Sequence, residues 1–137
     1  NYYFPADDRL LMPQFVVHGE YETLTTAYLL RELPSDAVCI DVGANVGYYT
    51  CLMARRAWQG RTIAFEADPA IHELLRDNVA INWCEKVVDA RNKAVADQPG
   101  ELTLYRRAGR SGNTSIAEVS AEEAGPLEEA RQWRAGS

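Results

Sequence analysis

Apolar positions along the chain change from a strand-like to a helix-like period, and their order predicts alternating strands and helices. The apolar run that begins at Val38 is typical of a β-strand, and residues 62–65 predict a second strand. After Pro69, apolar side chains recur at the spacing of one helical face. The positions on this face are Ile71, Leu74, Leu75, Asn78, Val79 and Asn82. This order predicts an α/β fold with a mostly parallel sheet flanked by helices.

Two positions on the apolar face of the helix predicted after Pro69 are polar, Asn78 and Asn82. Asn78 carries an amide there, and a buried amide must find hydrogen-bond partners. We therefore expect Asn78 to tie this helix to neighbouring backbone rather than to contact a ligand. Just upstream, Asp68 and Pro69 have the sequence of an N-cap and a first helical residue.

The turn after the first strand carries the most informative chemistry. Residues 41–47 have the pattern D-x-G-x-N-x-G, which places an acid at the strand end and glycines in the turn. Gly43 and Gly47 lack a Cβ, so the backbone can approach a ligand closely or adopt a positive φ. Asp41 supplies a carboxylate that suits a cationic ligand group. The dinucleotide-binding pattern G-x-G-x-x-G is absent here. The plainer alternative is an ordinary strand–turn–helix corner.

This turn resembles the first motif of methyltransferases that use S-adenosylmethionine (SAM), and its flanks are similar to the FkbM-type O-methyltransferases. The resemblance extends over about residues 16–116. It implies a Rossmann-like SAM-dependent methyltransferase fold. It also implies that SAM is the cofactor and that the turn holds it. The turn residues assigned to the cofactor are Asp41, Gly43, Ala44, Asn45 and Gly47.

A second acid follows the second predicted strand. Glu66 lies 19 residues after Gly47, the usual place for an acid that accepts hydrogen bonds from ribose hydroxyls. Glu66 is therefore the best single candidate for ribose binding. The alternative is that Glu66 is only a charge near a helix N-terminus, since Asp68 and Pro69 begin a helix immediately afterwards.

Weaker matches to the family lie on either side of these motifs. Residues 87–97 resemble its third strand and following turn, which implies that Asn92 hydrogen-bonds adenine and that Ala94 packs on it. Residues 102–105 resemble a hairpin strand, and residues 111–116 match a Gly-x-x-Ser segment. Upstream, Gly19 and Glu22 match a Gly-x-x-Glu element. The upstream segment is expected to form a lid over the cofactor or, equally, a helix that only covers the sheet edge.

The resemblance and the composition together predict one incomplete domain. Residues 1–36 form a lid or helical region, 37–116 the cofactor-binding core, and 117–137 an acidic helical tail. With 47% hydrophobic residues the chain can bury a core. The family domain continues with further strands that this chain lacks, so we expect an exposed sheet edge. A second copy or a partner chain could cover that edge.

Charge and cysteine content narrow the possible partners. The net charge of −6 argues against a nucleic-acid partner, and no apolar run reaches membrane-spanning length. Cys39, Cys51 and Cys84 lack C-x-x-C spacing, so we expect reduced thiols and a cytoplasmic protein. No histidine pair has metal-ligand spacing, and no metal is predicted; His18 alone is a candidate general base.

The predicted function is transfer of a methyl group from SAM to a hydroxyl of a small molecule, such as a sugar or a polyketide-like product. The sequence does not identify the catalytic base. Two other classes stay open. One is a non-catalytic SAM-binding module of a larger assembly. The other is a nicotinamide-dependent oxidoreductase, which the missing G-x-G-x-x-G disfavours.

Overall fold

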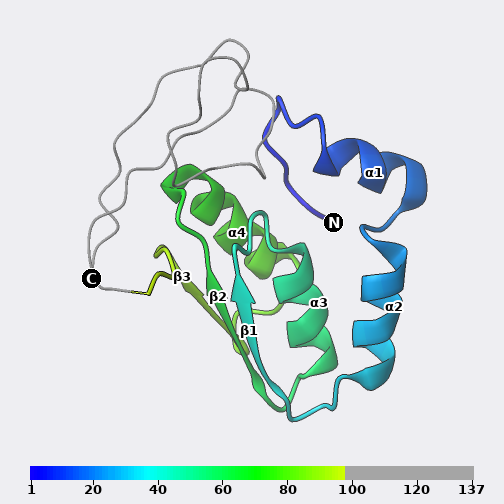
Figure 1. Ribbon diagram of the computed structural model, residues 1–137, viewed down its shortest axis with the longest axis vertical. Coiled ribbons are helices and arrows are strands. Elements are labelled where there is room, and N and C mark those ends of the chain that lie inside the picture. Colours follow the sequence, from blue (N-terminus) through cyan, green and yellow to red (C-terminus); the bar gives the residue numbers. More distant parts are fainter. Residues whose placement is uncertain (98–137) are drawn as a thin grey trace.

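The computed structural model describes residues 1–97, which form four helices and three strands (Figure 1). In chain order the elements are α1 (Leu11–His18), α2 (Thr23–Glu32), β1 (Val38–Val42), α3 (Tyr48–Arg56), β2 (Arg61–Phe65), α4 (Pro69–Ile81) and β3 (Val88–Arg91). The predictions for residues 102–105, 111–116 and 117–137 lie outside the described residues.

The three strands form one parallel sheet in the order β1-β2-β3. Ile40 pairs with Ile63 across β1 and β2, and Ala64 pairs with Ala90 across β2 and β3. Helices α3 and α4 cover one face of this sheet, and α2 packs on the outer side of α3 (Figure 1). The prediction of an α/β, Rossmann-like arrangement is confirmed for this part of the chain.

Small side chains fill the space between the sheet and its helices. Ala64 of β2 is fully buried, as are Cys51 of α3 and Leu75 of α4, which belong to the same cluster. A second cluster joins Cys39 of β1 to the far end of α3. Small residues at these positions let the helices approach the sheet closely. Cys84 is buried as well, and all three cysteines are free thiols.

Helix α4 begins where its sequence predicts. Asp68 is the N-cap, and its carboxylate accepts hydrogen bonds from the backbone N–H groups of Ala70 and Ile71, at 3.0 and 3.4 Å. Pro69 occupies the first helical turn, where its missing N–H costs nothing. Both features fix the path of the chain between β2 and α4, next to Glu66.

Asn78 makes the structural contacts expected of a buried amide. Its side chain is fully buried, and Nδ2 donates to the backbone oxygens of Val46 and Tyr3, at 2.8 and 2.9 Å. Its Oδ1 accepts from the backbone N–H of Tyr3 at 2.6 Å. Helix α4 therefore holds both the N-terminal segment and the turn after β1.

Aromatic rings bring the N-terminal segment and α1 onto α3. The Phe15 ring of α1 lies 4.9 Å from the Tyr48 ring, edge to face, and the Tyr2 ring lies 5.8 Å from the same Tyr48. Offset and edge-to-face ring pairs add stabilisation beyond the area they bury. Through these contacts α1 lies near the carboxyl end of the sheet although it has no fully buried residue.

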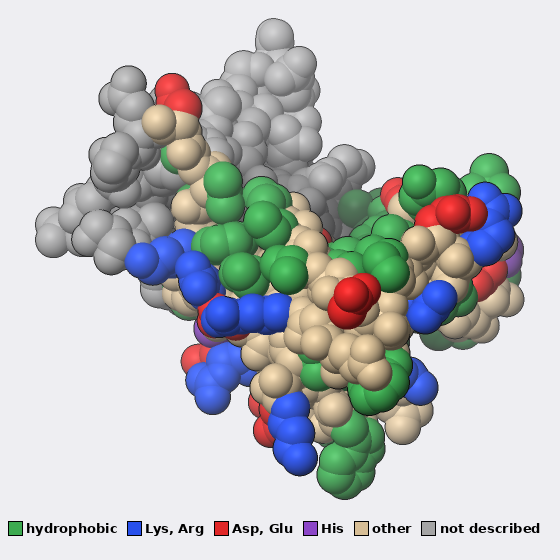
Figure 2. Space-filling view, turned by 90° about the horizontal axis from the view of Figure 1, so that it is seen from below, with side chains coloured by type: hydrophobic (Ala, Val, Ile, Leu, Met, Phe, Trp, Pro, Cys, Tyr) green, Lys and Arg blue, Asp and Glu red, His purple; other side chains and the backbone are tan. Residues whose placement is uncertain are grey.

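The other face of the sheet is open in the part of the chain that the structure describes. Val38, Ile40 and Val42 of β1 are 71%, 64% and 59% exposed. Figure 2 shows hydrophobic side chains gathered at the surface with Lys and Arg side chains beside them. On the β3 side, Asp89 pairs with Arg61 and Arg91. That a second copy or partner covers an edge of the sheet stays a prediction.

Replacing Gly60 with alanine is expected to destabilise the fold by about 2 kcal/mol. A Cβ on Gly60 would lie 1.9 Å from the backbone oxygen of Ala37, so the loop before β2 would have to move away from the start of β1. Denaturant unfolding measures the loss. Gly19→Ala is a control for backbone strain without a clash: a Cβ there meets nothing within 4 Å, but the φ of 75° disfavours any side chain, so we expect a smaller loss than at Gly60. Equal losses in the two variants would contradict this account.

Candidate functional site

The turn between β1 and α3 folds back onto the end of β2. The N–H groups of Gly43 and Ala44 both donate to the backbone oxygen of Phe65, each at 2.9 Å. Three residues of this turn adopt left-handed backbone conformations: Gly43 (φ 75°), Asn45 (φ 50°) and Gly47 (φ 87°). The turn thus lies across the carboxyl ends of two parallel strands, where α/β folds bind their ligands.

The two glycines of the turn have different roles. A Cβ on Gly47 would lie 2.5 Å from Cδ1 of Leu75, so Gly47 permits the close packing of α3 on α4. A Cβ on Gly43 meets nothing within 4 Å, which leaves the backbone at Gly43 open to a ligand. Of the two, Gly43 alone has the open backbone that close approach to a ligand requires.

Glu66 connects the two loops at this edge of the sheet. Its side chain is 9% exposed, and Oε2 accepts from the N–H of Asn45 at 2.8 Å while Oε1 accepts from the N–H of Asp68 at 2.9 Å. Burial raises the pKa of Glu66, and these backbone hydrogen bonds partly oppose the shift. Each carboxylate oxygen keeps a further lone pair for a hydroxyl donor.

Asp41 lies at the end of β1 and faces the α3 side of the sheet. Its Oδ2 accepts a hydrogen bond from Oγ1 of Thr50 at 2.5 Å. Burial raises the pKa of Asp41, and the bond from Thr50 lowers it in part. A carboxylate in this setting gains most from a cationic partner, because burial has removed much of its hydration.

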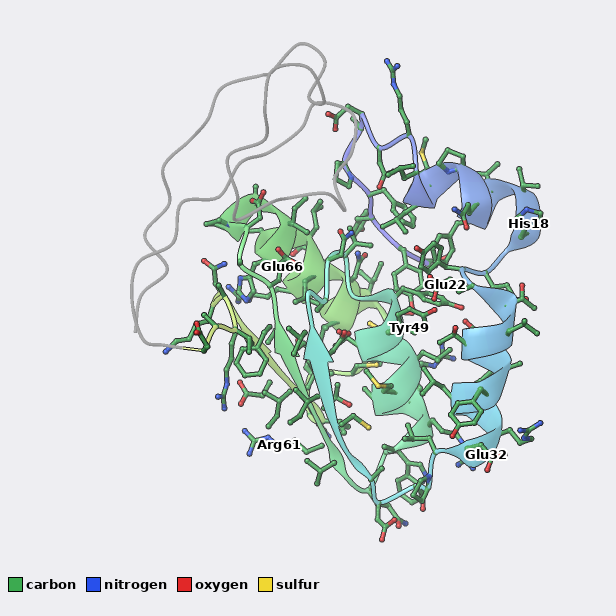
Figure 3. All side chains as sticks on the ribbon, in the orientation of Figure 1. His18, Glu22, Glu32, Tyr49, Arg61 and Glu66 are labelled. Carbon is green, nitrogen blue, oxygen red and sulfur yellow. The ribbon has the colours of Figure 1, made fainter. Side chains whose placement is uncertain are left out.

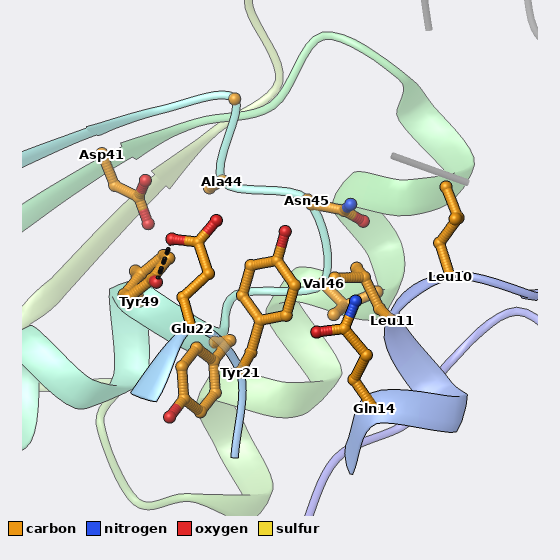
Figure 4. A pocket seen from close by; sticks show the side chains of 12 residues that line it. Leu10, Leu11, Gln14, Tyr21, Glu22, Asp41, Ala44, Asn45, Val46 and Tyr49 are labelled. Carbon is orange, nitrogen blue, oxygen red and sulfur yellow. Dashed lines mark hydrogen bonds between the residues drawn. The ribbon is translucent and has the colours of Figure 1, made fainter. Parts of the chain in front are cut away.

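A pocket of about 380 Å³ lies beside this turn (Figure 4). Its size is in the range of small-molecule sites. The lining residues come from the turn, from α3 and from the upstream segment: Leu10, Leu11, Gln14, Tyr21, Glu22, Asp41, Gly43, Ala44, Asn45, Val46, Tyr48 and Tyr49. Four of the eight predicted cofactor residues are among them: Asp41, Gly43, Ala44 and Asn45.

The upstream segment contributes a wall of this pocket. Tyr21 and Glu22 stand between α1 and α2 and point toward the turn (Figure 4). Oη of Tyr49 donates to a carboxylate oxygen of Glu22 at 2.7 Å. Tyr48 and Tyr49 were not predicted from the sequence as pocket residues. Their position directly after Gly47, at the start of the helix that follows the turn, could have indicated this role.

The other four predicted residues, Gly47, Glu66, Asn92 and Ala94, are not among the residues that line this pocket. Gly47 and Glu66 support the turn, as described above. Nδ2 of Asn92 donates to the backbone oxygens of Glu66 and Ala67, at 2.8 and 3.1 Å. Both amide hydrogens of Asn92 are therefore used, and its side-chain oxygen is the group left for a ligand. Ala94 is half-buried in the segment after β3. Their contacts with adenine stay predictions.

The histidines lie apart from the pocket lining. His18 is exposed at the end of α1, well away from Glu66 (Figure 3). His72 belongs to α4, and its Nε2 is buried without a hydrogen-bond partner in the described residues. Within residues 1–97 no three His, Cys, Asp or Glu side chains are grouped as a metal site requires, and no helix is long and apolar enough to cross a membrane.

The raised pKa of Asp41 predicts a pH-dependent difference between the wild type and Asp41→Asn. The carboxyl group of Asp41 binds its proton more tightly in the folded state than in the unfolded state. The wild type therefore loses stability as pH rises from the ordinary pKa of 3.8 to the raised pKa of the folded state. Asparagine still accepts from Thr50 and does not titrate. We expect the variant to gain stability relative to the wild type through this window, measured by urea unfolding from about pH 4 to about pH 8. A pH-independent difference would contradict the prediction.

Residues 41–133 match the family model described as the methyltransferase FkbM domain. This match covers more than half of the chain, so the chain belongs to the FkbM methyltransferase family. The resemblance found in the sequence is confirmed.

Two curated proteins are similar to this chain over part of their own length. The methyltransferase sdnD of Sordaria araneosa is 31% identical over 89 residues, which are 65% of this chain and 34% of that protein. The AMB antimetabolite synthetase AmbE of Pseudomonas aeruginosa is 34% identical over 88 residues, 64% of this chain and 4% of that protein. The chain therefore spans about a third of the first relative and a small part of the second.

Solved structures share the fold. TYW2 of P. horikoshii, crystallised with MeSAdo, superposes with a TM-score of 0.50 at 21% identity, over 74% of this chain and 33% of that one. At this identity the similarity concerns the arrangement of the strands and helices.

Proposed function

We propose that the chain is the cofactor-binding part of a SAM-dependent O-methyltransferase whose acceptor is a hydroxyl of a small molecule, such as a sugar or a polyketide-like product. Family membership supports methyl transfer, and the similarity to the curated relative sdnD, which is named a methyltransferase, agrees with it. The observation that carries the choice of cofactor is the hydrogen bonding of the turn.

Four of the five backbone N–H groups of residues 43–47 donate within the protein. Gly43 and Ala44 donate to Phe65, Asn45 donates to Glu66, and Gly47 donates to Ala44. A dinucleotide site needs such N–H groups free to hold its pyrophosphate. The turn instead presents acids, which favours a ligand with positive charge and hydroxyl donors over a nicotinamide dinucleotide.

The residues present fit SAM. The pocket lining includes the carboxylates of Asp41 and Glu22, and no lysine or arginine of the described residues lines it, which suits a sulfonium and an ammonium. Asn45 has a buried Oδ1 without a hydrogen-bond donor among the described residues, and a ligand N–H would satisfy it. Glu66 would accept from the ribose hydroxyls, and the open backbone at Gly43 would allow close approach.

When bound, SAM supplies a methyl group that an acceptor oxygen takes by displacement, which leaves S-adenosylhomocysteine. The chain's own contribution is alignment: Asp41 and Glu66 fix two parts of the ligand from two adjacent strand ends, so its methyl group points in a defined direction. A base must also remove the proton of the acceptor hydroxyl. Neither the acceptor site nor that base is assigned here.

Calorimetric titration with SAM, S-adenosylhomocysteine and NADH tests the proposed cofactor. We expect binding of the first two at micromolar concentrations and none of NADH. Binding of NADH alone would replace the proposal with an oxidoreductase, and a folded chain that binds none of the three would refute it.

The runner-up is a non-catalytic SAM-binding module. Among residues 1–97, no histidine or lysine that could act as a base lines the pocket, which favours this alternative. Both candidates predict SAM binding, so turnover separates them. Formation of S-adenosylhomocysteine that depends on an added hydroxyl acceptor supports the enzyme, and its absence in a longer, SAM-binding form of the protein supports the module.

A further inference from the structure

Glu22 holds its carboxylate at the pocket from an unusual backbone conformation. Its φ is 45° and its ψ is 66°, in the left-handed region that side-chain-bearing residues rarely adopt. Outliers of this kind persist where the surrounding structure imposes them, and they cluster at ligand sites. Here the conformation turns the side chain toward α3 and the turn after β1 (Figure 4).

Glu22 lies directly before α2, where its side chain could cap the helix, but it does not do so. It is the N-cap residue of α2, where an acid commonly accepts hydrogen bonds from the first turn of its own helix. Its side chain makes no such bond. It accepts instead from Oη of Tyr49 at 2.7 Å, across to α3 (Figure 3).

The surrounding contacts fix this arrangement. Oγ1 of Thr26 donates to the backbone oxygen of Tyr21 at 2.7 Å, and it lies 3.0 Å from Oη of Tyr48. Thr26 is 3% exposed. The first turn of α2 is therefore anchored to α3 on one side and to the residue before Glu22 on the other.

The charge of Glu22 has no partner within residues 1–97. The ion pairs there join Arg31 with Glu32, and Asp89 with Arg61 and Arg91. Glu22 and Asp41 both line the pocket, and no basic side chain lines it with them. Two carboxylates from different segments of the chain thus line a space that the described residues supply with no positive charge.

We propose that Glu22 is a ligand-binding residue that accepts a hydrogen bond from the ammonium group of the amino-acid part of SAM, in the pocket that Asp41 also lines. This assignment rests on the proposed function. Tyr49 is the positioning residue, because its hydroxyl holds the carboxylate of Glu22 in place. An ammonium group has three donors and favours acceptors on more than one side. The upstream segment then contributes to affinity directly as well as covering the pocket.

Titration with three ligands distinguishes a contact between Glu22 and the ammonium group from a general disturbance of the pocket. SAM carries both the ammonium and the sulfonium, S-adenosylhomocysteine carries only the ammonium, and 5′-methylthioadenosine carries neither. We expect Glu22→Gln to weaken SAM and S-adenosylhomocysteine alike, by about tenfold or more, with 5′-methylthioadenosine unchanged. Tyr49→Phe should cause a smaller loss with the same selectivity. Glu20→Gln makes the same chemical change two residues away, outside the pocket lining, and should leave all three affinities unchanged.

Each outcome of the titrations has a separate meaning. Unchanged binding of S-adenosylhomocysteine to Glu22→Gln would overturn the assignment, and so would an equal loss for all three ligands, which indicates a structural role. A larger loss for SAM than for S-adenosylhomocysteine would place Glu22 at the sulfonium instead. If the folded wild type binds none of the three ligands, the proposed function itself fails.

Discussion

Replacing Asn78 with alanine is expected to lower the free energy of unfolding by about 4 kcal/mol, because it removes three hydrogen bonds and leaves the backbone groups of Tyr3 and Val46 without these partners. The amide of Asn78 serves the N–H and the oxygen of Tyr3 and the oxygen of Val46. All three bonds are lost together, and Asn78 and its bond to Val46 are buried, so water cannot readily replace that bond. Urea denaturation followed by circular dichroism measures the change.

Asn82→Ala is the matched control for this prediction. Asn82 lies one turn further along the same helix face, and its Nδ2 donates to the backbone oxygens of Asn1 and Asn78. Its side chain is only half-buried, so water can take over these contacts, and we expect a loss of about 1 kcal/mol or less. If Asn78→Ala does not fold, Asn78→Ser keeps a small uncharged hydrogen-bonding side chain at the site and permits the measurement. Similar losses at positions 78 and 82 would contradict the structural role.

Glu66→Gln is expected to weaken SAM binding by about 10- to 100-fold, because hydrogen bonds to a charged group are stronger than those to a neutral one. The carboxylate accepts from Asn45 and Asp68 and has lone pairs left for the ribose. Glutamine presents one acceptor oxygen and an amide that cannot accept. Calorimetric titration of the two proteins measures the difference.

Loss of the ribose contact must be separated from disturbance of the turn, since Glu66 also holds Asn45. Adenosine and 2′,3′-dideoxyadenosine provide the comparison. The wild type should prefer adenosine, whereas Glu66→Gln should bind both with similar low affinity. A variant that keeps the full preference for adenosine would show that Glu66 acts only on the turn and would refute ribose binding.

The features that the sequence predicted correctly depend on neighbouring residues along the chain. Helix α4 follows from the period of its apolar positions, and its start follows from Asp68 and Pro69, whose capping geometry is local. The structural role of Asn78 was also predictable, because an amide on an apolar helix face must bond to something. The parallel sheet followed from the alternation of strands and helices.

The features that sequence reasoning did not predict depend on tertiary packing. Nothing near Gly47 in the chain indicates that its missing Cβ makes room for Leu75, which is 28 residues away. Likewise, the bonds from Gly43 and Ala44 to Phe65 require the register of β1 on β2. The bond between Glu22 and Tyr49 joins two helices whose packing no local pattern specifies. The cofactor contacts of the eight predicted residues stay predictions.

The single amide of Asn78 gives the first residues of the chain a thermodynamic role. It bonds to the backbone of Tyr3 on one side and to Val46 of the turn on the other, so ordering of either segment favours ordering of the other. The N-terminal segment thus behaves as an intramolecular ligand of α4. A molecule that immobilises the turn should consequently slow proteolysis and amide exchange around Tyr3, at a distance from anything it touches.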